Sequence, residues 1–181
     1  DLFCNGLRVS GAVDDASVML WNSNSGWKLD WDSPLAKVSS VQSSMWGDVD
    51  GNGWPDVFLC RNGANQLWLQ TDGQWTRDDS IESVEGPALN TVDGALFDAD
   101  HDGDLDIYVV NEDGPNVLLN NNRDGTWRSI GAEEGLPAID RGSRQVLVAD
   151  IDRDRDLDLI VLNTELPNDV FINDRLWRYR K

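Results

Sequence analysis

The feature that most constrains this chain is an internal repeat with a period of about fifty residues. An acidic nine-residue segment begins at residues 48, 98 and 150, where it reads DVDGNGWPD, DADHDGDLD and DIDRDRDLD. Two more markers follow each copy at the same period, an Asn-led segment and then a Trp just past a turn. These markers are Asn65, Asn116 and Asn168, and Trp75, Trp127 and Trp177. Three independent markers with one period predict an array of similar structural units.

Within one period, the sequence favours four short β-strands. In the middle copy, β-branched and aromatic residues indicate strands at 92–97, 106–111, 116–120 and 126–130, separated by turn-forming residues. No segment carries the sustained apolar i, i+3, i+4 stripe of a long amphipathic helix. Four antiparallel strands in a unit of this length are typical of a propeller blade. The alternative is a flat β-solenoid, whose repeats are usually shorter.

The predicted fold is therefore all-β, a β-propeller built of four-stranded antiparallel blades. The same markers run back into the first thirty residues, so we expect about three and three-quarter blades. The expected boundaries are 1–33 for a partial blade lacking its first strand and acidic loop, then 34–80, 81–130 and 131–181. Because open sheet edges invite pairing, we expect further blades from a longer chain or from another copy, unless four blades close unusually tightly.

The charge of the chain limits the classes of partner that it can bind. It has 33 acidic and 15 basic residues, a formal net charge of −18, and 27 of the acids are Asp. Asp is favoured in turns and metal loops, whereas a solvated helix surface favours Glu. Nucleic acid is excluded as a partner because phosphate binding needs a basic face. No apolar run is long enough for a membrane-spanning helix, and 40% hydrophobic residues with nine Trp argue against disorder.

Alternate acids in the three repeated loops predict calcium sites. Ca²⁺ takes roughly six to eight oxygen ligands, and acids on alternate residues of a tight loop converge on one point. We expect side chains at loop positions 1, 3, 5 and 9 and the backbone carbonyl at position 7 to bind the ion. The predicted ligands are Asp48, Asp50, Asn52, Trp54 and Asp56, then Asp98, Asp100, Asp102, Asp104 and Asp106, then Asp150, Asp152, Asp154, Asp156 and Asp158.

The third loop is predicted to be the weakest site. Its sixth position is Arg155, where the other two loops have Gly53 and Gly103. If the turn requires a positive φ at this position, a non-glycine residue there costs roughly 1 kcal/mol or more.

Other interpretations of the loops fit less well. The EF-hand shares the opening of this motif, but it needs an acid at position 12, where this chain has Leu59, Val109 and Val161. Oxygen ligands favour Ca²⁺ over Zn²⁺, and Mg²⁺ prefers to keep several waters. The remaining alternative is a set of Asp-rich turns without metal. Four carboxylates so close together would then repel unless some took up protons.

These motifs resemble the FG-GAP/VCBS repeats, the calcium-loop repeats of integrin α-subunit propellers and of many bacterial surface proteins. The resemblance rests on FDADHDGDLDIY at 97–108 and on NVLLNNNRDGTW at 116–127, followed by EEGLP at 133–137. The second stretch is similar to the subgroup related to cartilage acidic protein. The resemblance implies a propeller, usually of seven blades, with Ca²⁺ in the loop joining the first two strands of a blade. It also implies an extracellular or periplasmic setting.

The predicted function is that of a calcium-binding propeller serving as a secreted or cell-surface binding or adhesion module. Its ligand would be a protein or a glycan, and its calcium would be structural. No catalytic residue is predicted, since His101, the only histidine, has no nucleophile or carboxylate partner indicated by spacing and is expected to face solvent. The alternatives are the propeller part of a polysaccharide-active enzyme and a structural spacer domain in a larger surface protein.

The cysteines and tryptophans carry structural predictions. Cys4 and Cys60 lie at adjacent offsets on equivalent strands, which favours two small buried side chains over a disulfide. Trp54, next to a proline in a loop, is expected to be exposed. The repeated tryptophans are expected to pack between blades, and they are Trp27, Trp75, Trp127 and Trp177.

Overall fold

The computed structural model describes residues 2–4, 17–81, 87–131, 134–137, 142–175 and 178–181. Within these residues the chain forms fifteen β-strands and one short 3₁₀ helix, η1 (Pro34–Lys37). All strand pairs are antiparallel. The described part contains no helix long and apolar enough to cross a membrane.

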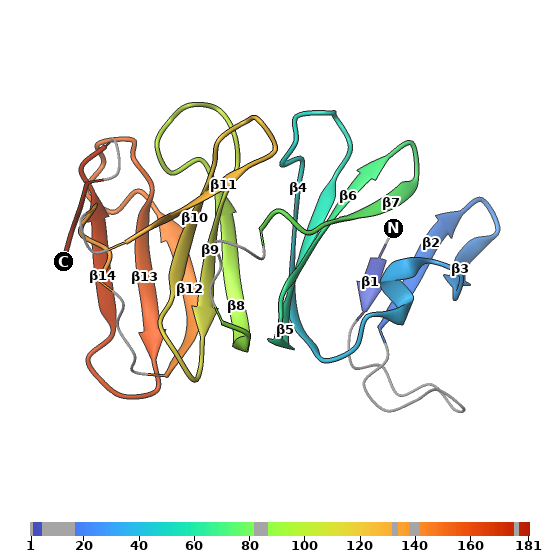
Figure 1. The fold of residues 1–181 in the computed structure, drawn as a ribbon, viewed down its shortest axis with the longest axis horizontal. Helices are drawn as coiled ribbons and strands as arrows, with labels where there is room; N and C mark the ends of the chain where they lie inside the picture. The colour runs from blue at the N-terminus through green and yellow to red at the C-terminus, as the bar shows by residue number, and fades with distance from the viewer. Residues whose placement is uncertain (1, 5–16, 82–86, 132–133, 138–141, 176–177) are drawn as a thin grey trace.

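The strands form four successive meanders, which lie side by side along the long axis of the molecule (Figure 1). The first has three strands, β1 (Leu2–Cys4), β2 (Val18–Ser23) and β3 (Gly26–Asp30). The second has four strands, β4 (Val41–Gly47), β5 (Asp56–Gly63), β6 (Gln66–Thr71) and β7 (Gln74–Asp78). The third comprises β8 (Leu89–Phe97), β9 (Asp106–Asn111), β10 (Val117–Asn121) and β11 (Trp127–Ile130). The fourth comprises β12 (Ser143–Ala149), β13 (Asp158–Asn163), β14 (Asp169–Asn173) and β15 (Tyr179–Arg180).

Each four-stranded meander is a propeller blade, so the predicted fold class is confirmed. The four strands predicted in the middle repeat are present, and the first of them begins three residues earlier than predicted, at Leu89. A register shift recurs in the first strand of each blade, and it lies between Val41 and Ser43, between Thr91 and Asp93, and between Ser143 and Gln145. Such bulges increase the local twist of a strand, so the repeat extends to backbone irregularities as well as to side chains.

The hydrophobic core lies between the blades. In β9 every residue is buried, and alternate side chains face opposite neighbours. Ile107 and Val109 belong to the core cluster shared with the second blade, whereas Tyr108 and Val110 belong to the cluster shared with the fourth. A central strand with both faces buried must be apolar at every core-facing position, which explains the continuous apolar run of the sequence there.

The repeated Asn marker connects neighbouring blades. Asn116 Oδ1 accepts the backbone N–H of Asn111 at 2.8 Å, which closes the turn between β9 and β10. Its Nδ2 donates to Ser143 Oγ of the next blade, also at 2.8 Å. The corresponding bond one repeat earlier joins Asn65 Nδ2 to Thr91 Oγ1 at 2.8 Å. The marker is therefore a turn cap and an inter-blade contact at once.

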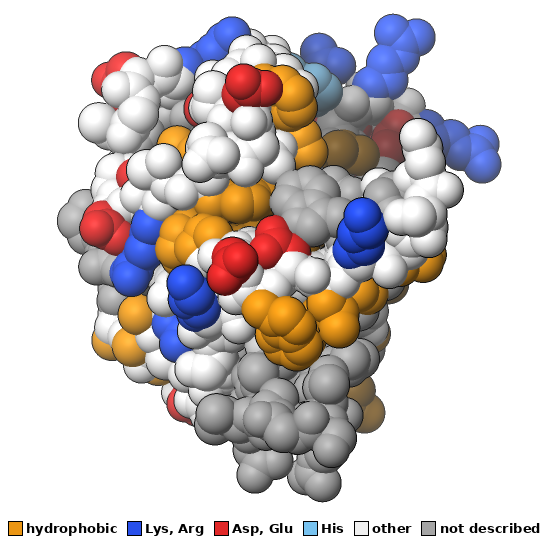
Figure 2. Space-filling view, turned by 90° about the vertical axis from the view of Figure 1, so that its right-hand side faces the viewer, with side chains coloured by type: hydrophobic (Ala, Val, Ile, Leu, Met, Phe, Trp, Pro, Cys, Tyr) orange, Lys and Arg blue, Asp and Glu red, His pale blue; other side chains and the backbone are white. Residues whose placement is uncertain are grey.

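The tryptophan predictions have mixed outcomes. Trp127 lies in the core between the second and third blades, Trp75 packs partly buried against the cluster between the first and second, and Trp54 is exposed. Trp27 is 57% exposed on β3 of the first meander, before which the described residues contain no further blade, so its packing between blades stays a prediction. Figure 2 views the end of the molecule at which the first meander lies, and it shows hydrophobic side chains at the surface beside acidic and basic ones. Trp177 lies outside the described residues.

The prediction for the cysteines is confirmed at Cys60, which is completely buried in the cluster between the second and third blades. The side chain of Cys4 lies outside the description, so the prediction for that residue stays untested.

Candidate metal centre

Each acidic nine-residue loop joins the first strand of a blade to its second strand. The sixth loop position has a positive φ in all three copies, +87° at Gly53, +92° at Gly103 and +79° at Arg155. The fourth position also has a positive φ, which the sequence did not indicate; its residues are Gly51, His101 and Arg153. Two left-handed residues wind each loop tightly and bring its alternate side chains to one side.

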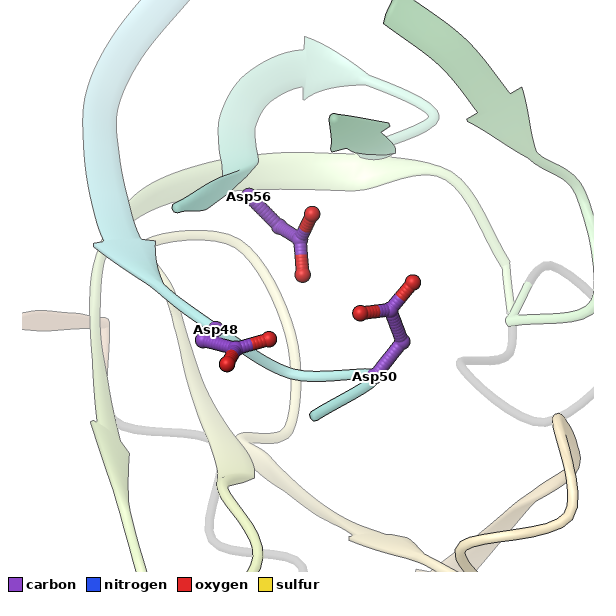
Figure 3. Close-up of side chains that lie close together, drawn as sticks. All are labelled: Asp48, Asp50 and Asp56. Atoms are coloured by element: carbon purple, nitrogen blue, oxygen red, sulfur yellow. The ribbon is translucent and has the colours of Figure 1, made fainter. Parts of the chain in front are cut away.

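The loops bring together their first, third and ninth residues. In each loop one carboxylate oxygen from each of these residues lies within 4.8 Å of the other two. In the first loop the three carboxylates, Asp48, Asp50 and Asp56, point into a common space (Figure 3). The other two trios are Asp98, Asp100 and Asp106, and Asp150, Asp152 and Asp158. Such a spacing suits one hard cation with oxygen ligands.

The ninth residue of each loop anchors that loop to its blade. Asp106 is fully buried, its Oδ2 accepts the N–H of Ala99 at 2.8 Å, and its Oδ1 accepts the N–H of Asn121 at 3.0 Å. Asp56 and Asp158 make the same two bonds within their own blades. One carboxylate therefore ties the start of the loop to the third strand. The signal for this role was the strict recurrence of Asp at position 9.

Burial raises the pKa of the anchoring carboxyls Asp56 and Asp106. The pKa of Asp106 rises to about 7 because the group is desolvated, and the two backbone N–H bonds offset only part of that effect. The pKa of Asp56 is also raised, again mainly by burial. In the same second loop, burial and then the nearby Asp102 raise the pKa of Asp100. A bound cation would favour the charged carboxylates and remove this cost.

The second loop also holds a buried oxygen that suits a cation. Asp98 Oδ2 accepts the N–H of Gly103 at 3.1 Å, whereas Asp98 Oδ1 is buried and has no hydrogen-bond partner among the described residues. Buried polar atoms almost always have a hydrogen-bond partner. The unpartnered oxygen of Asp98, which lies beside Asp100 and Asp106, therefore suits the role of a metal ligand. The residues present therefore fit Ca²⁺.

The side chains at the fifth loop position form hydrogen bonds within their own loops. Each accepts the backbone N–H of residue 7 of its own loop, as in the bond from Trp54 N to Asn52 Oδ1 at 2.7 Å. Asp102 and Asp154 accept the N–H groups of Asp104 and Asp156 in the same way. Asp102 and Asp154 are not members of the three trios, and the side chains at position 5 remain predicted ligands. The carbonyls of residue 7 remain predicted ligands.

The third loop has cationic side chains from its own blade beside its acids. Arg180 Nη2 lies 3.1 Å from Asp152 Oδ2, so a guanidinium contacts one carboxylate of the trio. Arg175 Nε lies 2.9 Å from Asp156 Oδ2. These contacts partly compensate the acidic charge of the third loop, in which Arg155 also has a positive φ.

His101 does not simply face solvent, as the sequence suggested. Its side chain is 45% exposed, and its Nε2 lies 2.7 Å from Oδ1 of the fully buried Asp156 in the next blade. Sequence spacing missed this partner because the two residues belong to different repeats.

One asparagine links each of the first two acidic loops to the following blade. Asn121 Nδ2 donates to the carbonyl of Val49 in the preceding blade at 2.7 Å, and Asn173 Nδ2 donates to that of Ala99 at 2.9 Å. Both accepting carbonyls belong to the second position of an acidic loop. No role was predicted for Asn121 and Asn173, although their spacing of 52 residues matches the repeat.

Comparison with known proteins agrees with this geometry. The family described as FG-GAP-like repeat matches residues 48–109 and 98–161, which together cover more than half of the chain and include all three acidic loops. The chain belongs to the FG-GAP-like repeat family. The two matched stretches overlap because each contains two successive acidic loops.

This FG-GAP-like chain is also similar to cartilage acidic protein 1. It is 36% identical over 67 residues to the protein of Xenopus tropicalis and 34% identical over 67 residues to that of Homo sapiens. In both cases the match covers 37% of this chain and 10% of the relative. The match thus spans about a tenth of the length of these relatives.

Proposed function

We propose that this chain is a calcium-binding propeller module in which Ca²⁺ has a structural role. The observation that carries the proposal is the threefold recurrence of a carboxylate trio on a tight loop, with raised pKa values at the buried members Asp56 and Asp106. Three copies of so costly an arrangement are best explained by a cation that neutralises each one. The third site is proposed to be the weakest.

The role proposed for the module is non-catalytic binding or adhesion, in a secreted, cell-surface or periplasmic setting. Membership of the FG-GAP-like repeat family supports a binding module, and oxygen-rich calcium loops work where calcium is abundant, as it is outside cells. The proposed ligand is a protein or a glycan. Further blades, from a longer chain or from another copy, would complete the ring.

The structural role of calcium is tested by removing it. Ligand that binds only the folded state stabilises it by RT ln(1 + [Ca]/Kd), or about 2.7 kcal/mol per site at a hundredfold excess. We expect the melting temperature to fall when EGTA replaces millimolar calcium and to recover when calcium is restored. Magnesium in place of calcium is the control and should restore it only weakly. An unchanged melting temperature in EGTA would rule out a structural calcium.

The proposed calcium ligands are tested with variants that each remove one carboxylate charge. We expect Asp98→Asn to remove one calcium from the stoichiometry measured by calorimetry and to leave the other two sites unchanged. Asp124→Asn, at an exposed turn carboxylate in the same blade, is the matched control and should keep the full stoichiometry. Equal calcium binding by both variants would contradict the assignment. Binding to protein and glycan arrays then separates a binding module from a spacer.

A further inference from the structure

The contact between the third and fourth blades buries a carboxylate between a histidine and an arginine side chain. Asp156, the seventh residue of the third loop, is fully buried. His101 Nε2, from the fourth position of the preceding loop, lies 2.7 Å from its Oδ1. Arg175 Nε, from the turn after β14, lies 2.9 Å from its Oδ2. The carboxylate is thus contacted by a nitrogen-bearing side chain from each of the two blades.

The equivalent carboxylate between the second and third blades lacks this arrangement. The side chain of Asp104 is only 10% exposed, and neither of its oxygens has a hydrogen-bond partner among the described residues. Arg123, the counterpart of Arg175, lies 3.9 Å away at its Nε, and its Nη1 donates instead to the carbonyl of Asp102 at 2.6 Å. At the position of His101, the preceding loop has Gly51. The donor that serves Asp156 is therefore missing at Asp104.

A cavity lies between Gly51 of the first acidic loop and Asp104 of the second. It has a volume of about 350 Å³, within the range of roughly 300–1,000 Å³ that is usual for small-molecule sites. Gly51 and Asp104 both line it, together with the apolar side chains of Leu67 and Trp127. The cavity lies where two acidic loops of successive blades face each other, at the place that His101 fills one blade later.

The charges around the cavity favour a cation. Its lining contains four carboxylates against the single guanidinium of Arg123, and the carboxylates are Asp48, Asp50, Asp78 and Asp104. Bound calcium would engage Asp48 and Asp50, which leaves Asp78 and the buried Asp104 for a second ligand. Leu69, which is only partly buried, and Trp127 give the lining an apolar part, which suits a flat, weakly hydrated group better than a compact hydrated ion.

We propose that this inter-blade cavity binds a planar cationic N–H donor, an imidazolium or guanidinium group, which donates to Asp104 from a place equivalent to that of His101 beside Asp156. The calcium loops keep their own ions, and the ligand binds beside them. Such a group is available on a His or Arg side chain of a partner protein or on a free small molecule.

The proposal is tested on ¹⁵N-labelled, calcium-loaded protein by NMR titration. Imidazole near neutral pH and methylguanidine are the probes, and tetramethylammonium, a cation without an N–H group, is the control at equal ionic strength. We expect both probes to cause saturable shifts at the amides of Gly51, Asp104 and Arg123, and tetramethylammonium to cause none that saturate. Absence of saturable shifts at these amides, or equal shifts with tetramethylammonium, overturns the proposal.

Two variants remove the site in different ways. Asp104→Asn should weaken both probes by about tenfold or more, because a charge-assisted hydrogen bond is lost. Gly51→His should abolish probe binding, since it places an imidazole where His101 lies one repeat later; the backbone allows this, with φ +74° at Gly51 and +66° at His101. Gly26→His, at another positive-φ glycine with open space around it, is the matched control and should bind as the parent does. Unchanged binding by Gly51→His would contradict the proposal.

A gain-of-site variant makes the test independent of any loss of folding. His101→Gly should open the matching cavity at Asp156, so that imidazole causes a second set of saturable shifts there and raises the melting temperature of this variant. An imidazole effect no larger than in the parent protein would count against the proposal.

The last arm distinguishes the two sources of the group. A capped tripeptide with a central Arg that binds several-fold more tightly than methylguanidine indicates a partner protein, and equal or weaker binding indicates a free small molecule. Either result presupposes the binding that the titration measures.

Discussion

At the scale of single residues, the Asp at the ninth position of each acidic loop has more than one role. Asp106 lies in the trio of the second loop and accepts one N–H from the loop and another from β10. Its position before an apolar strand was visible in the sequence, and its role as a predicted ligand followed from spacing. Its structural bonds could not be predicted, because Asn121 reaches it only after the blade has formed.

A prediction at this scale concerns the strained loop residue Arg155. Replacing it by Gly should stabilise the folded protein by about 1 kcal/mol, because a left-handed conformation is costly for a residue with a side chain. It should also tighten calcium binding at the third site. Urea unfolding and calorimetry measure the two effects.

The control for this variant is Arg144→Gly. Arg144 is an exposed residue of β12 without a positive φ, so Gly there should destabilise the protein by about 0.5–1 kcal/mol. If both variants shifted stability in the same direction, backbone strain at Arg155 would not be the cause.

At the scale of strands and loops, side-chain amides hold neighbouring blades together. Asn121 on β10 donates to the carbonyl of Val49 in the preceding blade, and Asn173 on β14 repeats the contact with Ala99. The two residues joined by each bond also donate their backbone N–H groups to a buried Asp at the ninth loop position of their own blade. The bond therefore aligns the acidic loop of one blade with the third strand of the next. The acidic loops therefore contribute to the contact between blades.

The corresponding prediction is that Asn121→Ala destabilises the protein by about 1–3 kcal/mol, because the buried Val49 carbonyl loses its donor. Chemical unfolding with and without calcium measures it, and we expect the loss in both conditions. Asn122→Ala is the matched control. Asn122 is exposed and bonds Asn120 and Thr126 within its own blade, so its loss should cost less than that of the inter-blade bond, about 1 kcal/mol or less. Similar losses in the two variants would argue against a special role for the inter-blade bond.

At the scale of the whole molecule, the net charge takes on a specific meaning. The three acidic loops hold 13 of the 33 acidic residues. Three bound Ca²⁺ would bring the formal charge from −18 to −12. Much of the Asp excess is thus concentrated where a cation is proposed, and like charges there repel most strongly when no cation is bound.

This charge distribution predicts a response to salt. Raising potassium chloride from low to near-molar concentration should raise the melting temperature of the EGTA-treated protein, since salt screens the repulsion between carboxylates. The calcium-loaded protein should respond less, because its loops are already neutralised. Calorimetric scans at matched pH measure both. An equal salt response in the two states would contradict the proposed concentration of unneutralised charge in the loops.

Much of the fold was determined by the sequence alone. The period of the markers, the alternation of acids and the apolar strands that follow them are local patterns, and a local pattern specifies a blade and its loop wherever it recurs. The positive φ at Arg155 followed in the same way from the glycines at equivalent positions.

Only the tertiary structure decided how blades meet. The pairing of His101 with Asp156, the bond from Asn121 to Val49 and the cavity beside Gly51 all join different repeats, 50 or more residues apart. Such contacts depend on the stacking of one blade against the next, which the pattern within a single repeat does not encode. The two acids Asp104 and Asp156 occupy the same loop position, and their surroundings differ because the preceding blade supplies Gly51 to one and His101 to the other.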